Sequence, residues 1–161
     1  MVAVSSGEPP TRSCRQMDGR AGTGGTWSHC RGRSPRSLNY WIAELNALMS
    51  ACSTADGRTL KAELRRLMQR AEQGDLRFGR GQDVDRMVTA KTVLEIRARR
   101  NVGITVGDDT GDRVVRLYFS EPEHAPDMLL AAKLGWKHPE GKTEQNEHAA
   151  EAAARVRDFF T

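Results

Sequence analysis

Two segments in the middle of the chain alternate apolar and polar residues with a period of two, the pattern of a strand buried on one side. The first, residues 92–99, reads T-V-L-E-I-R-A-R, and the second, residues 113–119, reads R-V-V-R-L-Y-F. A turn rich in glycine and aspartate lies between them, with residues 107–111 at its tip. The pattern predicts two antiparallel strands, and the short apolar run 128–134 predicts a third. Residues 76–88 are polar and contain glycine, so we expect a loop there.

Segments with helical periodicity surround this strand region. Apolar residues recur at helical spacing over 38–49, with Ser37 able to cap the start, and again over 59–73. The polar segment 53–57 separates these two helices, which we expect to pack as an antiparallel hairpin. A last helix is predicted over 143–160. The order predicts an α+β fold, in which an N-terminal helical hairpin packs on an antiparallel β-meander sheet followed by a C-terminal helix.

Charge is distributed unevenly along the chain. Residues 1–37 hold six arginines against Glu8 and Asp18, which accounts for the whole net charge of +4. Glycine, proline and serine are frequent there, so we expect a disordered basic tail followed by one domain over residues 38–161. Three interpretations of this tail stay open: a solvated tail, an over-long translated start, and a basic arm that contacts RNA. Residues 58–100 carry 12 basic and 6 acidic groups, which suggests a surface that faces a polyanion.

Several classes of protein are excluded by composition. No apolar run approaches the ~18 residues that a membrane span requires, and the start MVAVSSGEPP lacks the apolar stretch of a signal peptide. The three cysteines, Cys14, Cys30 and Cys52, form no C-x-x-C pair, and their odd number argues against a zinc site or a disulfide framework. We therefore expect a cytoplasmic protein with no membrane partner, metal ion or small-molecule cofactor.

Arginines gather on the polar sides of the two alternating strands. Arg97 and Arg99 share one side of the first strand, and Arg116 and Tyr118 share one side of the second. If the apolar sides cover the same helices, these residues share an open sheet face. Arginine can clamp phosphate through two parallel hydrogen bonds, and an exposed tyrosine can stack on a base. From alternation alone, a solvated face in which an arginine pairs with Glu95 is the simpler interpretation.

A second group of cations follows the third predicted strand. Its members are Lys133, Lys137, His138 and Lys142. Neighbouring positive charge lowers the pKa of a histidine and favours the neutral form that a general base requires, so His138 is a candidate base or acid. Residues 135–143 resemble a phosphate-binding P-loop, but five residues rather than four separate the glycines. A nucleotide-binding P-loop is therefore not expected.

Taken in order, these segments resemble the RelE/ParE toxin superfamily, and most closely its HigB-type branch. The resemblance rests on V-L-E-I-R, then V-R-L-Y-F, then an apolar strand, then W-K-H-P-E-G-K-T-E-Q-N-E-H-A-A-E-A-A-A-R-V-R-D-F-F, and it covers roughly residues 60–160. It implies a small RelE-like α+β toxin of a type II toxin–antitoxin system, neutralised by a cognate antitoxin protein. In the RelE and HigB branches it implies cleavage of mRNA on the ribosome. The family opens with a strand before its helical hairpin, which residues 25–29 or 40–42 would have to supply.

The resemblance also implies roles for individual residues. Arg116 matches the phosphate-contacting arginine of the family's second strand, and Arg97 falls at a basic position on the first. Lys137 or His138 matches the basic position after the third strand. The expected function is a metal-independent endoribonuclease that cleaves mRNA and arrests growth. Its expected catalytic residues are Arg97, Arg116, Lys137 and His138, and its expected substrate contacts are Arg99, Tyr118, Lys133 and Lys142. Two alternatives stay open: a ParE-like inhibitor of DNA gyrase that docks without catalysis, and an inactive domain whose only partner is an antitoxin.

Overall fold

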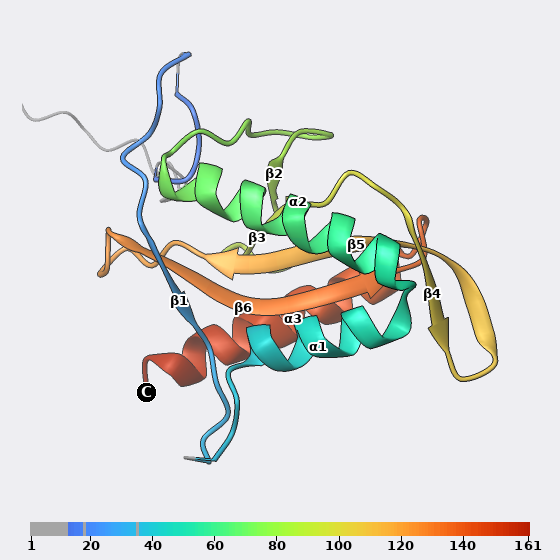
Figure 1. The fold of residues 1–161 in the computed structure, drawn as a ribbon. Coiled ribbons are helices and arrows are strands. Elements are labelled where there is room, and N and C mark those ends of the chain that lie inside the picture. Colours follow the sequence, from blue (N-terminus) through green and yellow to red (C-terminus); the bar gives the residue numbers. More distant parts are fainter. Residues whose placement is uncertain (1–12, 18, 35) are drawn as a thin grey trace, which may run out of the picture.

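The fold is known from a computed structural model, which describes residues 13–161 apart from residues 18 and 35. Its strands are β1 (Thr26–His29), β2 (Val84–Arg86), β3 (Leu94–Arg97), β4 (Val102–Val106), β5 (Asp109–Ser120) and β6 (Met128–Lys137), and its helices are α1 (Tyr40–Ala51), α2 (Thr54–Glu72) and α3 (Lys142–Phe159). The strands form one sheet in the order β1-β6-β5-β3-β2, with β4 paired to β5 (Figure 1). Only the β1–β6 pair among these is parallel. The expected α+β class is confirmed.

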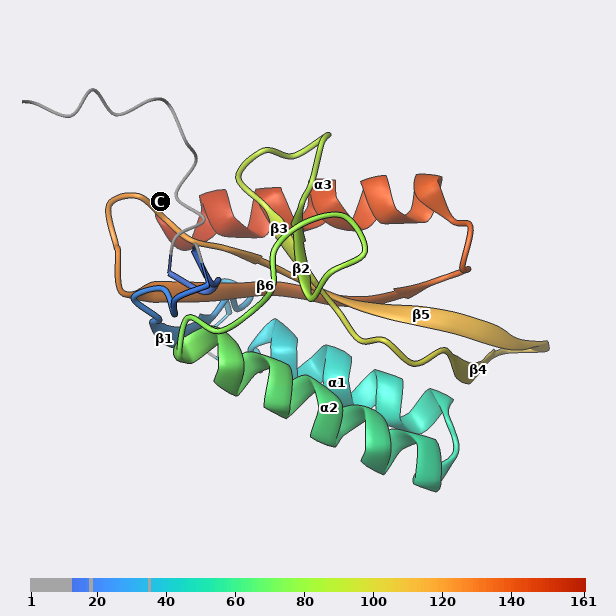
Figure 2. The same cartoon turned by 90° about the horizontal axis from the view of Figure 1, so that it is seen from above.

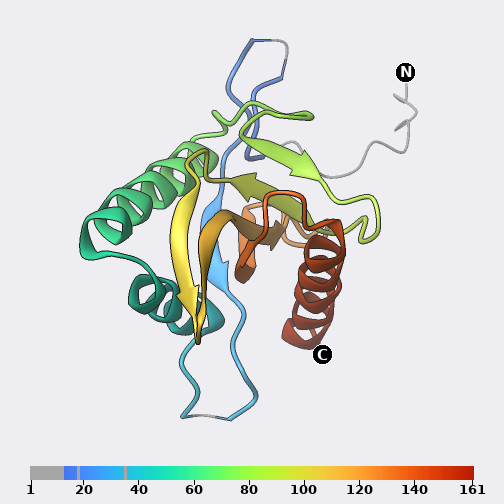
Figure 3. The same cartoon turned by 90° about the vertical axis from the view of Figure 1, so that its right-hand side faces the viewer.

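The sheet is buried on both faces. Helices α1 and α2 cover one face and α3 covers the other, as Figures 2 and 3 show. The first face carries the alternating apolar residues of the central strands, including Ile96, Leu117 and Phe119, all fully buried. The second face forms a smaller apolar cluster with Ala149 and Ala152 of α3. No helix of the described residues is long and apolar enough to cross a membrane.

Capping side chains explain where the first two helices begin. Asn39 accepts a hydrogen bond from the Ile42 amide at 2.8 Å and caps α1, so Ser37 is not the cap. Ser53 accepts from the Asp56 amide at 3.1 Å and caps α2, which therefore starts within the predicted break at 53–57. The two helices are joined by a shorter turn than the sequence predicted.

The N-terminal segment departs most from the sequence prediction. Residues Thr26–His29 pair in parallel with Met128–Ala131 of β6 and supply the strand that opens the fold. The indole of Trp27 donates to the Met68 carbonyl at 2.9 Å and packs edge-on against Phe119. The boundary predicted at residue 38 is therefore wrong, and the helical hairpin is not N-terminal, because β1 precedes it. The first 12 residues of the expected tail lie outside the described residues.

The segment predicted as a loop over 76–88 contains a strand. Its residues Val84–Arg86 pair antiparallel with Leu94–Ile96 of β3 and form the end of the sheet opposite β1. Three residues are too few for an alternating pattern to be recognised, which explains why the sequence does not reveal β2. This strand brings the loop before it close to the arginines of β3.

Candidate functional site

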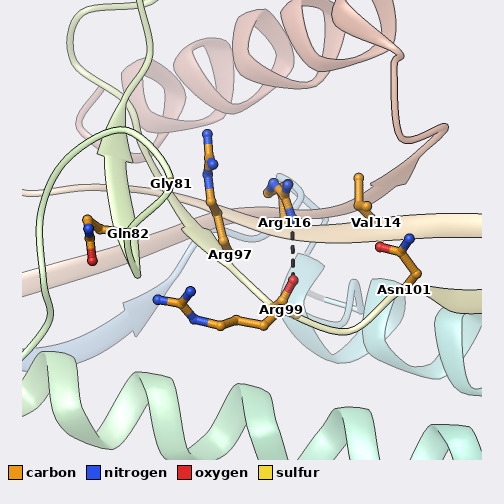
Figure 4. A pocket seen from close by; sticks show the side chains of 8 residues that line it. Gly81, Gln82, Arg97, Arg99, Asn101, Val114 and Arg116 are labelled. Carbon is orange, nitrogen blue, oxygen red and sulfur yellow. Dashed lines mark hydrogen bonds between the residues drawn. The ribbon is translucent and has the colours of Figure 1, made fainter.

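Arg97 of β3 and Arg116 of β5 lie directly opposite each other in the sheet register, so their side chains share one face. Both point towards the α3 layer and line a pocket of about 260 Å³ (Figure 4). The remaining lining residues are Gly81, Gln82, Ala98, Arg99, Asn101 and Val114. The sequence prediction that Arg97 and Arg116 share a face is confirmed.

The pocket lies at the connection between β3 and β4. Residues 98–101 connect the two strands beside β5, and the loop that contains Gly81 and Gln82 forms another wall. Three of the eight lining residues are arginines, and two carry side-chain amides. Guanidinium and amide groups donate hydrogen bonds, so the pocket suits a phosphate or another oxyanion.

A buried carboxylate lies between the arginines. Glu95 is only 1% exposed, and its Oε1 accepts from Nε and Nη2 of Arg97 at 3.2 and 3.1 Å. Its Oε2 accepts from Nε2 of Gln145 on α3 at 2.8 Å and lies 3.9 Å from Nε of Arg116. Glu95 therefore neutralises part of the arginine charge and ties the pocket to α3.

Arg116 retains unused donor capacity. Its Nη1 donates to the carbonyl of Val115 at 3.0 Å and, more weakly, to that of Ala98 at 3.4 Å. Its buried Nε has no hydrogen-bond partner among the described residues. Burial lowers the pKa of Arg116, Glu95 counteracts this effect, and Arg97 adds to it. An oxyanion in the pocket would supply the acceptor and the negative charge that this guanidinium lacks.

Lys137 lies on the same side of the sheet as the arginines. It lies on β6 directly opposite Val114 of β5, which lines the pocket, and only 6% of Lys137 is exposed. Burial lowers the pKa of Lys137, and the cation of Arg116 lowers it further. A lysine with a lowered pKa gives up its proton more readily, which is the property required of a proton donor.

His138 follows β6 and is oriented by the start of α3. Its Nδ1 lies 2.5 Å from Oε1 of Glu144, and its backbone amide donates to the same oxygen at 3.3 Å. Burial alone would raise the pKa of Glu144, but the hydrogen bonds from the His138 ring and amide outweigh this and lower it. If Nδ1 carries the proton of that hydrogen bond, Nε2 is left as a proton acceptor. The contacts of the described residues give His138 a carboxylate partner, and they include none between its ring and Arg97 or Arg116.

The arginine face is covered rather than open, which corrects the role expected for Tyr118. Helix α3 lies close against β6, since a Cβ on Gly135 would be 2.8 Å from Nδ1 of His148. The ring of His148 packs edge-on against Tyr118 at 5.8 Å, and Tyr118 is 0% exposed. Burial raises the pKa of Tyr118. A base cannot stack on a ring enclosed in this way.

Lys133 is also not available to a substrate. Its ammonium lies 2.9 Å from a carboxylate oxygen of Glu44 on α1 and 3.0 Å from one of Glu151 on α3. Arg155 joins the same group by pairing with both carboxylates. Because α1 and α3 meet through these ion pairs, Lys133 has a structural role, contrary to the expected substrate contact.

Arg99 and Lys142 were expected to contact substrate along with Arg97 and Arg116. Arg99 lines the pocket but does not point towards the α3 layer (Figure 4). It lies beyond the end of β3 at Arg97, and the Arg99 guanidinium donates to Asp83 at 3.0 Å. The prediction that Arg99 shares the sheet face of Arg97 is therefore wrong. Lys142 is exposed at the first position of α3 and does not line the pocket.

Several residues of the site were missed from the sequence. Gln145 and Glu144 of α3 contact Glu95 and His138 respectively, and Gln82 and Asn101 of two loops line the pocket, so only the tertiary fold brings these residues to the site. Glu95 was recognised as an arginine partner, but not as a buried one. Its position on an alternating strand was visible, whereas its burial depends on α3.

Comparisons with protein-family models, with curated proteins and with solved structures gave no match. The geometry of the pocket and the resemblance of the sequence are therefore the grounds for a functional proposal.

Proposed function

We propose that this protein is a RelE/ParE-like toxin, closest to the HigB type, and acts as a metal-independent endoribonuclease on translated mRNA. The observation that carries the proposal is the pairing of Arg97 with Arg116 at a pocket lined by three arginines. The order of elements supports it as well, because a strand precedes the two helices, as the resemblance requires. The cytoplasmic site of action is part of the same proposal.

The proposed reaction is an internal transesterification. The 2′-hydroxyl of one nucleotide attacks the adjacent phosphorus, the bond from phosphorus to the 5′ oxygen breaks, and the products are a 2′,3′-cyclic phosphate and a 5′-hydroxyl. A base accepts the 2′ proton and an acid protonates the departing 5′ oxygen, so the step balances without an added reactant. Negative charge grows on the non-bridging oxygens and requires fixed cations nearby.

The residues of the site can divide these tasks. Arg97 and Arg116 would bind the non-bridging oxygens, because both guanidiniums face the pocket. His138, held by Glu144, would accept the proton, and Lys137, whose pKa is lowered, would donate one. His138 must approach the phosphate for this chemistry, so substrate binding would have to bring its Nε2 to the pocket.

The test is expression of Arg116→Ala from a tightly regulated promoter. Wild type should arrest growth, and mRNA 5′ ends should map within codons of translated messages. Removing one charge-stabilising donor typically costs about 10²–10³ in rate, so folded Arg116→Ala should be harmless. The matched control is Arg157→Ala, an exposed arginine in the last turn of α3, which should stay toxic. A folded Arg116→Ala protein that still arrests growth would overturn the proposal.

Purified protein separates this activity from a metal-dependent one. Cleavage of mRNA on ribosomes should leave a 2′,3′-cyclic phosphate and a 5′-hydroxyl, because the attacking group is the 2′-hydroxyl and not a metal-activated water. Wild-type protein with ribosomes and mRNA that leaves every message intact would also contradict the proposal.

A second candidate is a ParE-like inhibitor of DNA gyrase that acts by docking. It is favoured by the partner of His138, which is Glu144 rather than either arginine. In that case cells would show a DNA-damage response with intact mRNA, and Arg116→Ala would act through binding alone. An inactive domain that only binds its antitoxin would cause neither effect. In each case we propose a cognate antitoxin with an acidic segment that occludes the arginine pocket.

A further inference from the structure

The basic segment 58–100 buries two of its six acidic residues. It holds 12 basic and 6 acidic groups. Asp83 is 4% exposed and pairs with Arg70 and Arg99, and Glu95 is 1% exposed and pairs with Arg97. Outside these pairs the segment keeps nine basic and four acidic groups, so its remaining charge is still strongly positive.

Two more of the acidic residues are engaged within the fold. Glu63 accepts the backbone amide of Arg99 at 2.6 Å, and Asp75 accepts from the side chain of Gln16 at 2.6 Å. Of the six, only Glu72 and Asp85 make no side-chain hydrogen bond or ion pair with a distant part of the described chain. The six carboxylates thus leave few groups to neutralise arginines at the surface.

Two exposed arginines are chain neighbours of pocket-lining residues, and a third, Arg66, is exposed on α2. Arg80 immediately precedes the lining residues Gly81 and Gln82, and Arg100 lies between Arg99 and Asn101, which also line it. Across residues 13–161 as described, no hydrogen bond or ion pair engages the guanidinium of Arg66, Arg80 or Arg100. These side chains are free to meet an anion that extends beyond the pocket.

Arg66 belongs to this group because of its position on α2. Residues 63, 66 and 70 follow one another at helical spacing on a single side of the helix. Glu63 bonds to the Arg99 amide, and Arg70 bonds to Asp83, which in turn holds the Arg99 guanidinium. Arg66 lies between these two anchors on the same side of α2, which places it on the side of the helix that faces Arg99.

We infer that Arg66, Arg80 and Arg100 form an outer basic track that binds backbone phosphates of single-stranded RNA on either side of the phosphate held in the pocket. The inference rests on the proposed function, because it assigns the same substrate to a larger surface. Arginines that have no acidic partner bind phosphate without regard to base sequence, and they release counterions as they do so. RNA is chosen over an acidic peptide because the pocket beside these arginines is the proposed site of the scissile phosphate.

The experiment compares two RNA probes that cannot be cleaved, a 2′-O-methyl dinucleotide and a 2′-O-methyl 12-mer. The dinucleotide reaches only the pocket, whereas the 12-mer also covers the track. Binding is measured across a salt series for wild type and for the triple variant Arg66→Ala, Arg80→Ala, Arg100→Ala. The matched control is Arg31→Ala, Arg36→Ala, Arg157→Ala, which removes the same charge from exposed arginines elsewhere.

The track variant should lose at least about tenfold in affinity for the 12-mer at low salt. Its plot of log affinity against log salt should become shallower by about 2, since each single-strand phosphate contact contributes ~0.7. Dinucleotide binding should be unchanged, and the control variant should behave like wild type. Replacing the same three arginines by lysine should restore the slope, because lysine binds phosphate as a point charge.

Each remaining outcome counts against the track. An unchanged slope in the track variant would overturn it, and so would equal losses in the track and control variants. A larger loss of affinity for polyglutamate than for the 12-mer in the track variant would assign the track to an acidic peptide instead. The proposed function has a separate readout: if wild type binds the 12-mer through the track but leaves translated mRNA on ribosomes intact, the ribonuclease fails and the track stands.

Discussion

Leu117 and Tyr118 are neighbours on β5 and point into opposite faces of the sheet, and the two faces differ in chemistry although both are buried. The face under α1 and α2 is lined by aliphatic and aromatic side chains. The face under α3 carries Glu95, Arg97, Arg116, Lys133 and Lys137 from the same strands. Burial alone therefore does not distinguish the face that stabilises the fold from the face that holds the candidate site.

The difference follows from what each helix layer brings to the sheet. The amphipathic α2 contributes leucines, among them Leu60, Leu64 and Leu67, which fill the space above the apolar face. Helix α3 contributes small residues and polar groups such as Gln145, which satisfies Glu95. A face covered in this way can keep charged groups dry and paired. Burying charged groups lowers stability, and we infer that this face keeps them because they serve the pocket.

The difference between the two faces is tested most directly by removing a side chain from the apolar face. Leu117→Ala should lower the free energy of unfolding by about 3–4 kcal/mol, because a fully buried leucine leaves a cavity in a packed core. That is a large fraction of the 5–15 kcal/mol typical of a domain. Urea denaturation followed by circular dichroism gives the value. The control, Val106→Ala at an exposed position of β4, should change it by less than about 0.5 kcal/mol, and a similarly small loss at Leu117 would show that this face is not the core.

The apolar face is also the part of the fold that the sequence predicts well. Residues 94, 96, 115, 117 and 119 were placed on one side by alternation alone, and the structure buries all five. Local periodicity is sufficient there because the apolar residues of each strand alternate and so identify its buried side. Periodicity does not reveal β1, because its four residues come from a glycine- and arginine-rich segment and pair with β6, about 100 residues later. Only the family resemblance indicated residues 25–29 as one of two candidates for this strand.

The polar face could be predicted only in part. Alternation correctly put Arg97 and Arg116 on one side, since register depends on the strands themselves. It could not show that α3 covers that side, because the small alanines of the helix do not indicate which surface they pack against. The roles expected for Tyr118 and Lys133 failed for this reason, while the arginine pair did not depend on α3.

The polar face is probed by neutralising its buried carboxylate. Glu95→Gln should lower the free energy of unfolding by about 1–3 kcal/mol, because Arg97 and Arg116 lose a buried partner while remaining charged. The same change should tighten binding of inorganic phosphate by roughly fivefold, since a nearby negative charge is removed. Calorimetry and urea denaturation on the same preparation measure both effects.

The opposite signs of these two effects distinguish a binding site from a purely structural ion pair. Glu72→Gln changes the net charge equally at an exposed position of α2, and it should leave both stability and phosphate binding nearly unchanged. Weaker phosphate binding by folded Glu95→Gln protein would mean that Glu95 holds the arginines in their binding geometry, and that the charge of the carboxylate matters less than its position.

The smallest effect is expected at Tyr118, where the polar face has a group that it does not satisfy. The hydroxyl of Tyr118 is buried and has no hydrogen-bond partner among the residues that the structure describes. An unsatisfied buried hydroxyl costs about 1–3 kcal/mol, so Tyr118→Phe should raise the free energy of unfolding by about 1 kcal/mol. The chain's only other tyrosine supplies the control: Tyr40 is half-buried, and Tyr40→Phe should change stability by less than about 0.5 kcal/mol.

Tyr118→Phe should also leave the proposed activity unchanged. Because an enclosed ring cannot stack on a base, growth arrest by Tyr118→Phe should equal that of wild type. A folded Tyr118→Phe protein that is less stable would show that the hydroxyl has a hydrogen-bond partner. A folded Tyr118→Phe protein that is no longer toxic would show that α3 moves to expose the hydroxyl in the working state.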